Sequence, residues 1–200
     1  MYEFQVLLQK NADSLFPKLC VAYMKKKEGY QSAIELIKVI SGVCSPQFLE
    51  NVYLKHMKKL IEEYVSEKHK NPGHAMTNCR ECDIIVNMAH SIDIAKNFDT
   101  SKKFVKSFLP EKQGYQKKAF KLLNVMIDRV HPSFLIELYE MVEGATLVSS
   151  GAKAIKLQCF FKILNKIEFS DNTIHDIVKM VQVMLPEVLI ALKESNQKTR

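Results

Sequence analysis

Apolar residues recur along this chain at the spacing of one side of a helix. The segment 113–130 shows the pattern best, with apolar positions at Tyr115, Ala119, Leu122, Leu123, Met126, Ile127 and Val130. This spacing of i, i+4, i+7 and i+8 places apolar side chains in one stripe along a helix. Similar stripes run through residues 49–64 and 159–167, and no segment alternates apolar and polar positions beside a hairpin turn. The pattern predicts an all-α protein.

Helix-breaking residues separate the stripes. Clusters containing Gly, Pro, Ser or Asn occur at residues 42–46, 71–73, 110, 131–133, 149–151 and 170–173. Ser45 precedes Pro46, and Asp171 and Asn172 precede the apolar position Ile174. Such side chains can cap the free amides of a first helical turn, so these positions predict helix starts.

The helical segments also repeat at an interval of about forty residues. "EGYQSAIELIKVI" (28–40) and "QGYQKKAFKLLNVM" (113–126) share a Gly-Tyr-Gln opening, and "SGAKAIKLQCFFKIL" (150–164) begins at the corresponding point. "TNCRECDIIVNMAHSI" (77–92) fills the gap between the first two. Each of these first helices is followed by a predicted second helix, over residues 46–68, 100–109, 132–144 and 173–194.

This recurrence predicts a HEAT/armadillo-like α-solenoid, a right-handed array of about four antiparallel helix pairs. In such an array the apolar face of each pair is covered by its neighbours. A single globular helical bundle is the alternative. Because "SNQKTR" (195–200) resembles the start of a further helix, we expect residues 1–200 to be one HEAT-repeat segment. It would be a fragment of a longer solenoid, or one that a neighbouring chain completes by a swap.

Composition narrows the class of protein without identifying it. The 200 residues are 47% hydrophobic, enough for a real core, and carry a formal charge of +7, which permits an anionic partner. The N-terminal residues lack the features of a signal peptide, and no apolar run is long enough to span a bilayer. Five scattered cysteines without a secretory signal indicate a reduced, intracellular environment, and we expect no membrane partner.

One cysteine pair has the spacing of a metal or redox motif. Cys79 and Cys82 form a CxxC, with His69, His74 and His90 nearby in sequence. Zinc requires four ligands, the motif supplies two, and no second pair has matching spacing. Cysteines three residues apart in a predicted helix simply share a face, so ordinary helix residues are the preferred interpretation. Phosphate-binding loops and the GxSxG and HExxH motifs are also absent, so the sequence predicts no enzyme, cofactor or metal.

Lysines crowd the side of segment 113–130 that lies opposite its apolar stripe. Lys117, Lys118 and Lys121 lie in the first helix of one predicted pair, and Lys153 and Lys156 lie in the first helix of the next. Matched positions of successive repeats line up into one ridge in a solenoid, and a basic ridge could track a phosphate backbone. These five lysines are therefore candidate nucleic-acid contacts. The alternative is an ordinary solvated face.

Three segments carry a family resemblance. "FLPEKQGYQKKAFKLLNVM", "SSGAKAIKLQCFFKIL" and "VMLPEVLIALKESNQKTR", in that order and spacing, resemble the ribosomal RNA-processing protein 12 family over about residues 108–200. The N-terminal half, with its CxxC, follows no motif of that family. The resemblance implies a nucleolar HEAT-repeat scaffold that associates with precursors of the small ribosomal subunit and supports pre-rRNA maturation and subunit export.

The resemblance also bears on partners and on single residues. It implies pre-ribosomal RNA and assembly factors as partners, together with the nuclear transport machinery, and a nuclear location. Lys117, Lys118 and Lys121 coincide with the family's "QKKA" motif, which favours anionic contact, whereas Gln116 and Ala119 are interpreted as structural. The main alternative is a protein-only HEAT scaffold similar to a segment of a nuclear transport receptor, which would hold a helix or tail in a concave groove.

Overall fold

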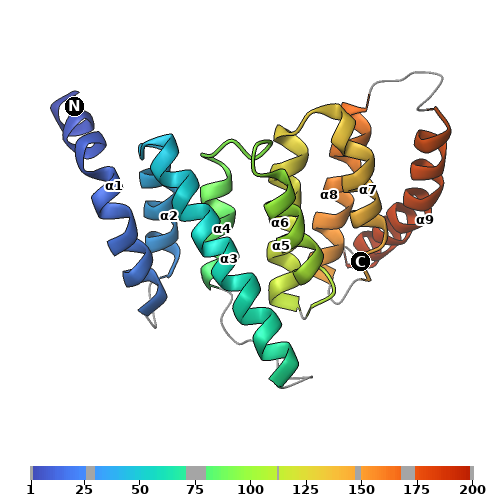
Figure 1. The fold of residues 1–200 in the computed structure, drawn as a ribbon. Coiled ribbons are helices and arrows are strands. Elements are labelled where there is room, and N and C mark those ends of the chain that lie inside the picture. The colour runs from blue at the N-terminus through green and yellow to red at the C-terminus, as the bar shows by residue number, and fades with distance from the viewer. Residues whose placement is uncertain are drawn as a thin grey trace. The chain divides into compact units, whose positions relative to one another are not determined.

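Helices occupy nearly all of the chain in the computed structural model, which describes residues 2–25, 30–70, 80–111, 113–146, 150–167 and 174–198 (Figure 1). Over these residues the backbone forms α-helices and one short 3₁₀ helix, joined by turns, and none of them lies in a strand. The predicted all-α class is confirmed.

The chain divides into two compact units, Met1–Phe108 and Leu109–Arg200. The first unit contains α1 (Tyr2–Lys25), α2 (Tyr30–Ser41), α3 (Pro46–Lys70), α4 (Arg80–Ala89) and α5 (Phe98–Phe108). Within it α1 and α2 pack on each other and both pack on α4, while α3 packs on α4 and α5. Each helix therefore covers the apolar stripe of a neighbour.

The second unit is built around one central helix. It contains α6 (Gln113–Arg129), η1 (Pro132–Phe134), α7 (Leu135–Glu143), α8 (Ser150–Lys166) and α9 (Ile174–Lys198). Helix α8 packs on α6, α7 and α9, and α6 also packs on α7. The four predicted second helices correspond to α3, α5, η1 with α7, and α9.

One predicted boundary is wrong. Helix α9 continues without a break to Lys198, so Ser195–Lys198 end a helix and do not begin a further one. No helix-breaking residue separates Ser195 from the preceding turns, and even Pro186 lies inside α9. The predicted start at Ser45 and Pro46 agrees with the beginning of α3, whereas Asp171 and Asn172 lie outside the described residues.

Polar side chains fix the starts of two helices in the first unit. Asp13 of α1 accepts hydrogen bonds from the Ser45 amide at 2.8 Å and from the Ser45 hydroxyl at 2.5 Å, directly before α3 begins. These hydrogen bonds hold the pKa of the Asp13 carboxyl below its ordinary value, and the bond from the Ser45 hydroxyl has the larger effect. Because they cross between helices, they anchor the start of α3 to α1.

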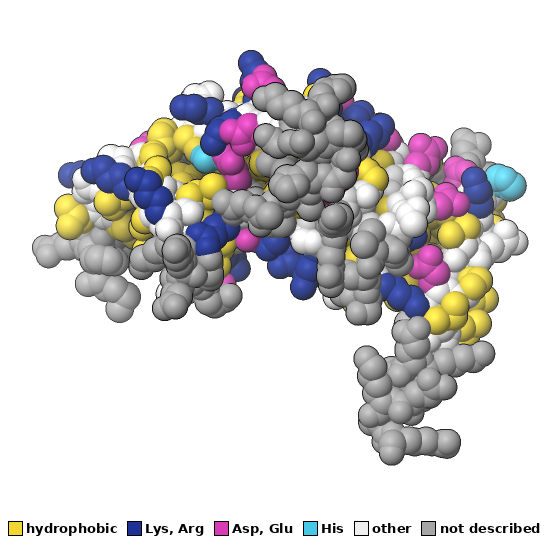
Figure 2. All heavy atoms as spheres, turned by 90° about the horizontal axis from the view of Figure 1, so that it is seen from below, with side chains coloured by type: hydrophobic (Ala, Val, Ile, Leu, Met, Phe, Trp, Pro, Cys, Tyr) yellow, Lys and Arg dark blue, Asp and Glu magenta, His cyan; other side chains and the backbone are white. Residues whose placement is uncertain are grey.

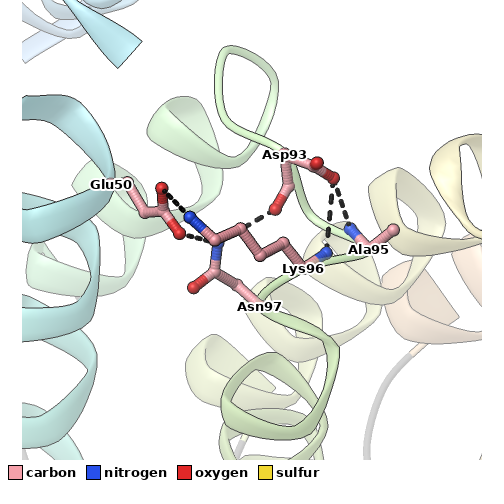
Figure 3. Close-up of polar contacts among 5 residues, drawn as sticks. All are labelled: Glu50, Asp93, Ala95, Lys96 and Asn97. Carbon is pink, nitrogen blue, oxygen red and sulfur yellow. Dashed lines mark hydrogen bonds and ion pairs between the residues drawn. The ribbon is translucent and has the colours of Figure 1, made fainter. Parts of the chain in front are cut away.

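A second polar cluster ties α3 to the connection between α4 and α5 (Figure 3). Glu50 of α3 accepts hydrogen bonds from Lys96 Nζ and Asn97 Nδ2, each at 3.0 Å. Asp93 accepts from the amides of Ala95 and Lys96 at 3.2 and 3.3 Å and so shapes the turn that leads into α5. The turn is therefore stabilised by hydrogen bonds within it and by hydrogen bonds to α3.

The predicted apolar stripes are mostly buried where the structure describes them, and Val52, Ile61 and Leu164 are half-buried. In the second unit Leu122, Leu123, Met126 and Phe160 have no exposed surface, and Phe160 contacts Tyr139 of α7 at a ring separation of 5.6 Å. Cys159 and Ile163 of α8 are equally buried. The core of this unit is therefore the space between α8 and the helices packed on it.

Core truncation should destabilise the protein strongly. We expect Leu123→Ala or Phe160→Ala to lower the free energy of unfolding by about 2–5 kcal/mol, because each leaves a cavity that neighbouring side chains cannot fill. Urea denaturation followed by far-UV circular dichroism measures this. Phe161→Ala is the matched control, since Phe161 is 49% exposed beside the buried Phe160 and its loss should cost much less. Equal losses for Phe160 and Phe161 would contradict the assigned stripe.

The Asp13 contact predicts a pH dependence. A lowered carboxyl pKa contributes stability above the unfolded-state value of about 3.9, and this contribution disappears as the pH falls through the folded-state pKa. Asp13→Asn should therefore reduce stability at neutral pH and make progressively less difference in acid. Urea denaturation of both proteins at pH 7 and at about pH 3 tests this. A stability difference that is equal at both pH values would show that Asp13 does not act through its charge.

Candidate nucleic-acid interface

Helix α6 has two sides of opposite character. Gln116, Ala119 and Phe120 are fully buried against the rest of the second unit. Lys117 and Lys121 are exposed on the other side, one turn apart, so their side chains share a face. Lys118 is half-buried next to them. The prediction that this basic group lies opposite the buried stripe is therefore confirmed for Lys117 and Lys121.

Gln116 is a structural residue of the same motif. Its Nε2 donates hydrogen bonds to the carbonyl of Leu109, at 2.7 Å, and to the carbonyl of Thr146, at 2.6 Å. A buried amide thus joins the segment before α6 to the segment after α7, which satisfies polar groups that burial would otherwise leave unpaired. Ala119 is buried as expected. The "QKKA" motif therefore combines inward residues that hold α6 in place with outward lysines.

Lys156 differs from its predicted place on the basic ridge. The residue is only 5% exposed, with Nζ 3.5 Å from Glu187 Oε1 of α9 and 3.3 Å from the carbonyl of Ala145. The ammonium also lies 5.6 Å from the centre of the Phe160 ring, close enough for a cation–π contact. Lys156 therefore fixes α8 to α9 from inside the unit. Its proposed role as a surface contact for nucleic acid is corrected on this ground.

Other lysines of α8 are also half-buried or bound to neighbouring groups. Lys153 is half-buried. Lys162 pairs with Asp128 at the end of α6, and Lys166 donates to the carbonyls of Ile127 and Asp128 at 2.8 and 2.6 Å. A cation at a helix C-terminus satisfies carbonyls that the helix leaves free and complements its dipole. Lysines of α8 thus stabilise the end of α6, which the repeat pattern did not indicate.

A second group of basic residues lies on α5 of the first unit. Lys103 and Lys106 are exposed, while Lys102 pairs with Asp99 at 3.1 Å and lies 5.2 Å from the ring centre of Phe98. The sequence carries a signal for this group that the repeat comparison overlooked. "KKFVK" (102–106) and "KKAFK" (117–121) have the same order of lysine and apolar positions. Each helix therefore has one apolar side, which is buried, and one basic side.

The possible metal and acid–base groups form no site among the described residues. Cys82 is buried in α4 and His90 is exposed, whereas Cys79, His74 and the side chain of His69 lie outside the described residues. Among the residues whose placement is described, no group of three or more His, Cys, Asp and Glu side chains could hold a metal. The interpretation of the CxxC as ordinary helix residues stays a prediction.

A buried carboxylate, that of Glu81, lies between α3 and α4. His56 of α3 contacts it at 2.8 Å, and Lys59 lies 3.7 Å from the same carboxylate oxygen. Burial opposes ionisation of Glu81, but the hydrogen bond from His56 and the charge of Lys59 outweigh it and lower the pKa. Since a buried carboxylate needs such partners, this cluster is explained by the packing of α3 on α4.

No family model and no curated protein matches the sequence, so the family resemblance of residues 108–200 stays a prediction. Within the described residues, no helix combines the length and the apolar character that crossing a membrane requires.

The double hydrogen bond of Gln116 predicts a stability effect. Gln116→Leu fills similar space but leaves the carbonyls of Leu109 and Thr146 without their donor, which should cost about 1–3 kcal/mol. Gln158→Leu, at an exposed position of α8, is the matched control and should change stability by about 0.5 kcal/mol or less. Chemical denaturation measures both variants. A Gln116→Leu protein as stable as the control would contradict the anchoring role.

Proposed function

We propose that this chain is a non-enzymatic α-solenoid scaffold that binds RNA-rich particles through the basic face of α6, defined by Lys117, Lys118 and Lys121. The particles would be precursors of the small ribosomal subunit in the nucleolus or nucleus. The observation that carries the proposal is the geometry of α6, whose buried side is anchored in the second unit while its opposite side presents lysines to solvent.

Contacts within each unit support the solenoid. In the first unit the first helices of successive pairs, α2 and α4, pack on each other, as do the second helices α3 and α5. In the second unit the first helices α6 and α8 pack on each other, and each also contacts the second helix of its own pair, α7 or α9. Stacking of like helix on like helix is the arrangement that a repeat array requires.

Charge and sequence support the anionic partner. The two basic segments "KKFVK" and "KKAFK" both lie on helices whose other side is apolar, and the whole chain carries a formal charge of +7. Lysines on one face of a rigid helix can neutralise phosphates without contacting the base edges. Such contacts suit a folded RNA that is bound through the arrangement of its phosphates and not through its base sequence. The resemblance of residues 108–200 adds the ribosomal context, with assembly factors and the nuclear transport machinery as further partners.

A protein-only scaffold, similar to a segment of a nuclear transport receptor, is the second candidate. Exposed aliphatic side chains along α9 favour it, because apolar surface of this kind suits a protein partner and not a phosphate backbone.

RNA binding measured across a salt series tests the proposal. The probe is a dye-labelled structured RNA hairpin, and the variant carries Lys117→Glu, Lys118→Glu and Lys121→Glu. We expect at least a tenfold loss of affinity at low salt. The slope of log affinity against log salt should fall by roughly 2–3 units, a little under one unit for each lost phosphate contact. The far-UV spectrum should be unchanged, since Lys117 and Lys121 are exposed and Lys118 is only half-buried.

A charge-matched control separates a defined interface from general attraction. Lys10, Lys18 and Lys25 of α1 are exposed, and replacing all three with Glu changes the net charge by the same amount. This control should retain most of the affinity and the slope. Equal losses in the two triple variants would overturn the assignment to α6. A wild-type chain with no measurable affinity for RNA would overturn RNA binding itself and leave the protein-only scaffold.

A further inference from the structure

Helix α9 is apolar on two adjacent sides, of which the rest of the second unit covers only one. Ile177, Met180 and Met184 point inward and are buried. A second row points outward and is 44–57% exposed: Ile174, Val178, Val181, Leu185 and Leu189. We name this row the outer stripe. Hydrophobic side chains gather at the right-hand end of Figure 2, over α9.

The outer stripe is large and free of charge. Its five half-exposed side chains present on the order of 500 Å² of apolar surface, as much as the largest patch on a typical monomer. The exposed titratable residues His175 and Lys179 lie to one side of it on the helix, and no charged residue lies within it. Covering such a surface with a second apolar surface is favourable, because it removes apolar area from water.

Four of the five residues of the outer stripe are placed symmetrically in sequence about a point between Val181 and Gln182, and the fifth, Val181, lies beside that point. Val178 and Leu185 are equally far from this point along the chain, and so are Ile174 and Leu189. A two-fold axis through the point would place an identical antiparallel helix with its own stripe directly opposite. This is the self-complementarity that a contact between two identical surfaces needs.

Side-chain sizes agree with this arrangement. The axis pairs Val178 with Leu185 and Ile174 with Leu189 of the second helix, so each pair joins a β-branched side chain to a leucine, and the two copies of Val181 lie next to each other on either side of the axis. Alternating narrow and broad side chains across a helix contact is what close packing requires. The axis also places Lys179 opposite the position of Met184, so that it brings no lysine against another lysine.

We propose that the outer stripe pairs two copies of this chain through an antiparallel α9–α9 contact. Joining two stripes would bury about 1,000 Å² of apolar surface in total, near the lower limit for a specific interface. Helix α9 from Ile174 to Leu189 spans roughly 24 Å, so the contact extends over more than four turns. The proposal is independent of the RNA-binding face, because Lys117, Lys118 and Lys121 belong to α6.

Molar mass in solution tests the pairing. Size-exclusion chromatography with light scattering, at micromolar to millimolar loading, should give twice the chain mass of 23.0 kDa. Val181→Glu should give a monomer with an unchanged helical spectrum, because two carboxylates would meet at the axis. Leu185→Glu should do the same away from the axis. Val39→Glu is the control, since Val39 is 58% exposed on α2 and its replacement should leave the dimer intact.

Charge complementation tests the register. Val181→Glu and Val181→Lys proteins should each be monomeric, and their equimolar mixture should form a heterodimer because opposite charges meet at the axis. A monomeric wild-type chain, or a Val181→Glu protein that remains dimeric, would overturn the proposal and leave the outer stripe to a different protein partner. A mixture that stays monomeric would overturn the two-fold axis beside Val181.

Discussion

Every packed helix of this protein has an apolar stripe that it cannot cover by itself, and the two units are the result of that constraint. The second unit shows it most directly, because α8 serves three neighbours at once. Its buried positions include Ala152, Cys159, Phe160 and Ile163, which meet α6, α7 and α9 from different sides. This is why even a lysine of α8 is drawn into the interior.

Polar contacts act as further links between helices. Gln116 joins two connections of the second unit, Lys156 joins α8 to α9, and Lys166 completes the end of α6. In the first unit Asp13 and Glu50 perform the same task for α3 and for the turn before α5. Gln116 and Lys156 are buried, and a buried polar group without a partner is costly, so their contacts narrow the number of ways in which the helices can pack. Apolar burial brings the helices together, and these bonds select their positions.

The second unit presents two surfaces of different chemistry. The basic face of α6 suits phosphate, whereas the outer stripe of α9 suits a second helix. They arise in the same way, as the residues left over when one side of each helix has been buried. The two surfaces belong to different helices, so a partner bound to one of them does not occupy the other.

Local pattern by itself determined the all-α class, most helix limits, the buried stripe of α6 and the outward position of Lys117 and Lys121. These follow from a period of 3.6 residues, which any one segment displays without its neighbours. Tertiary structure decided what depends on distant residues. In the sequence, Lys156 is equivalent to the lysines of α6. In the structure, α9 places Glu187, which lies thirty-one residues later in the chain, beside it. Likewise Ser195 resembled the start of a helix, and the unbroken course of α9 placed it at the end of one. Which side of α9 meets α8 was open as well, because its apolar arc is wide enough to bury two different rows, and only packing on α8 chose Ile177, Met180 and Met184.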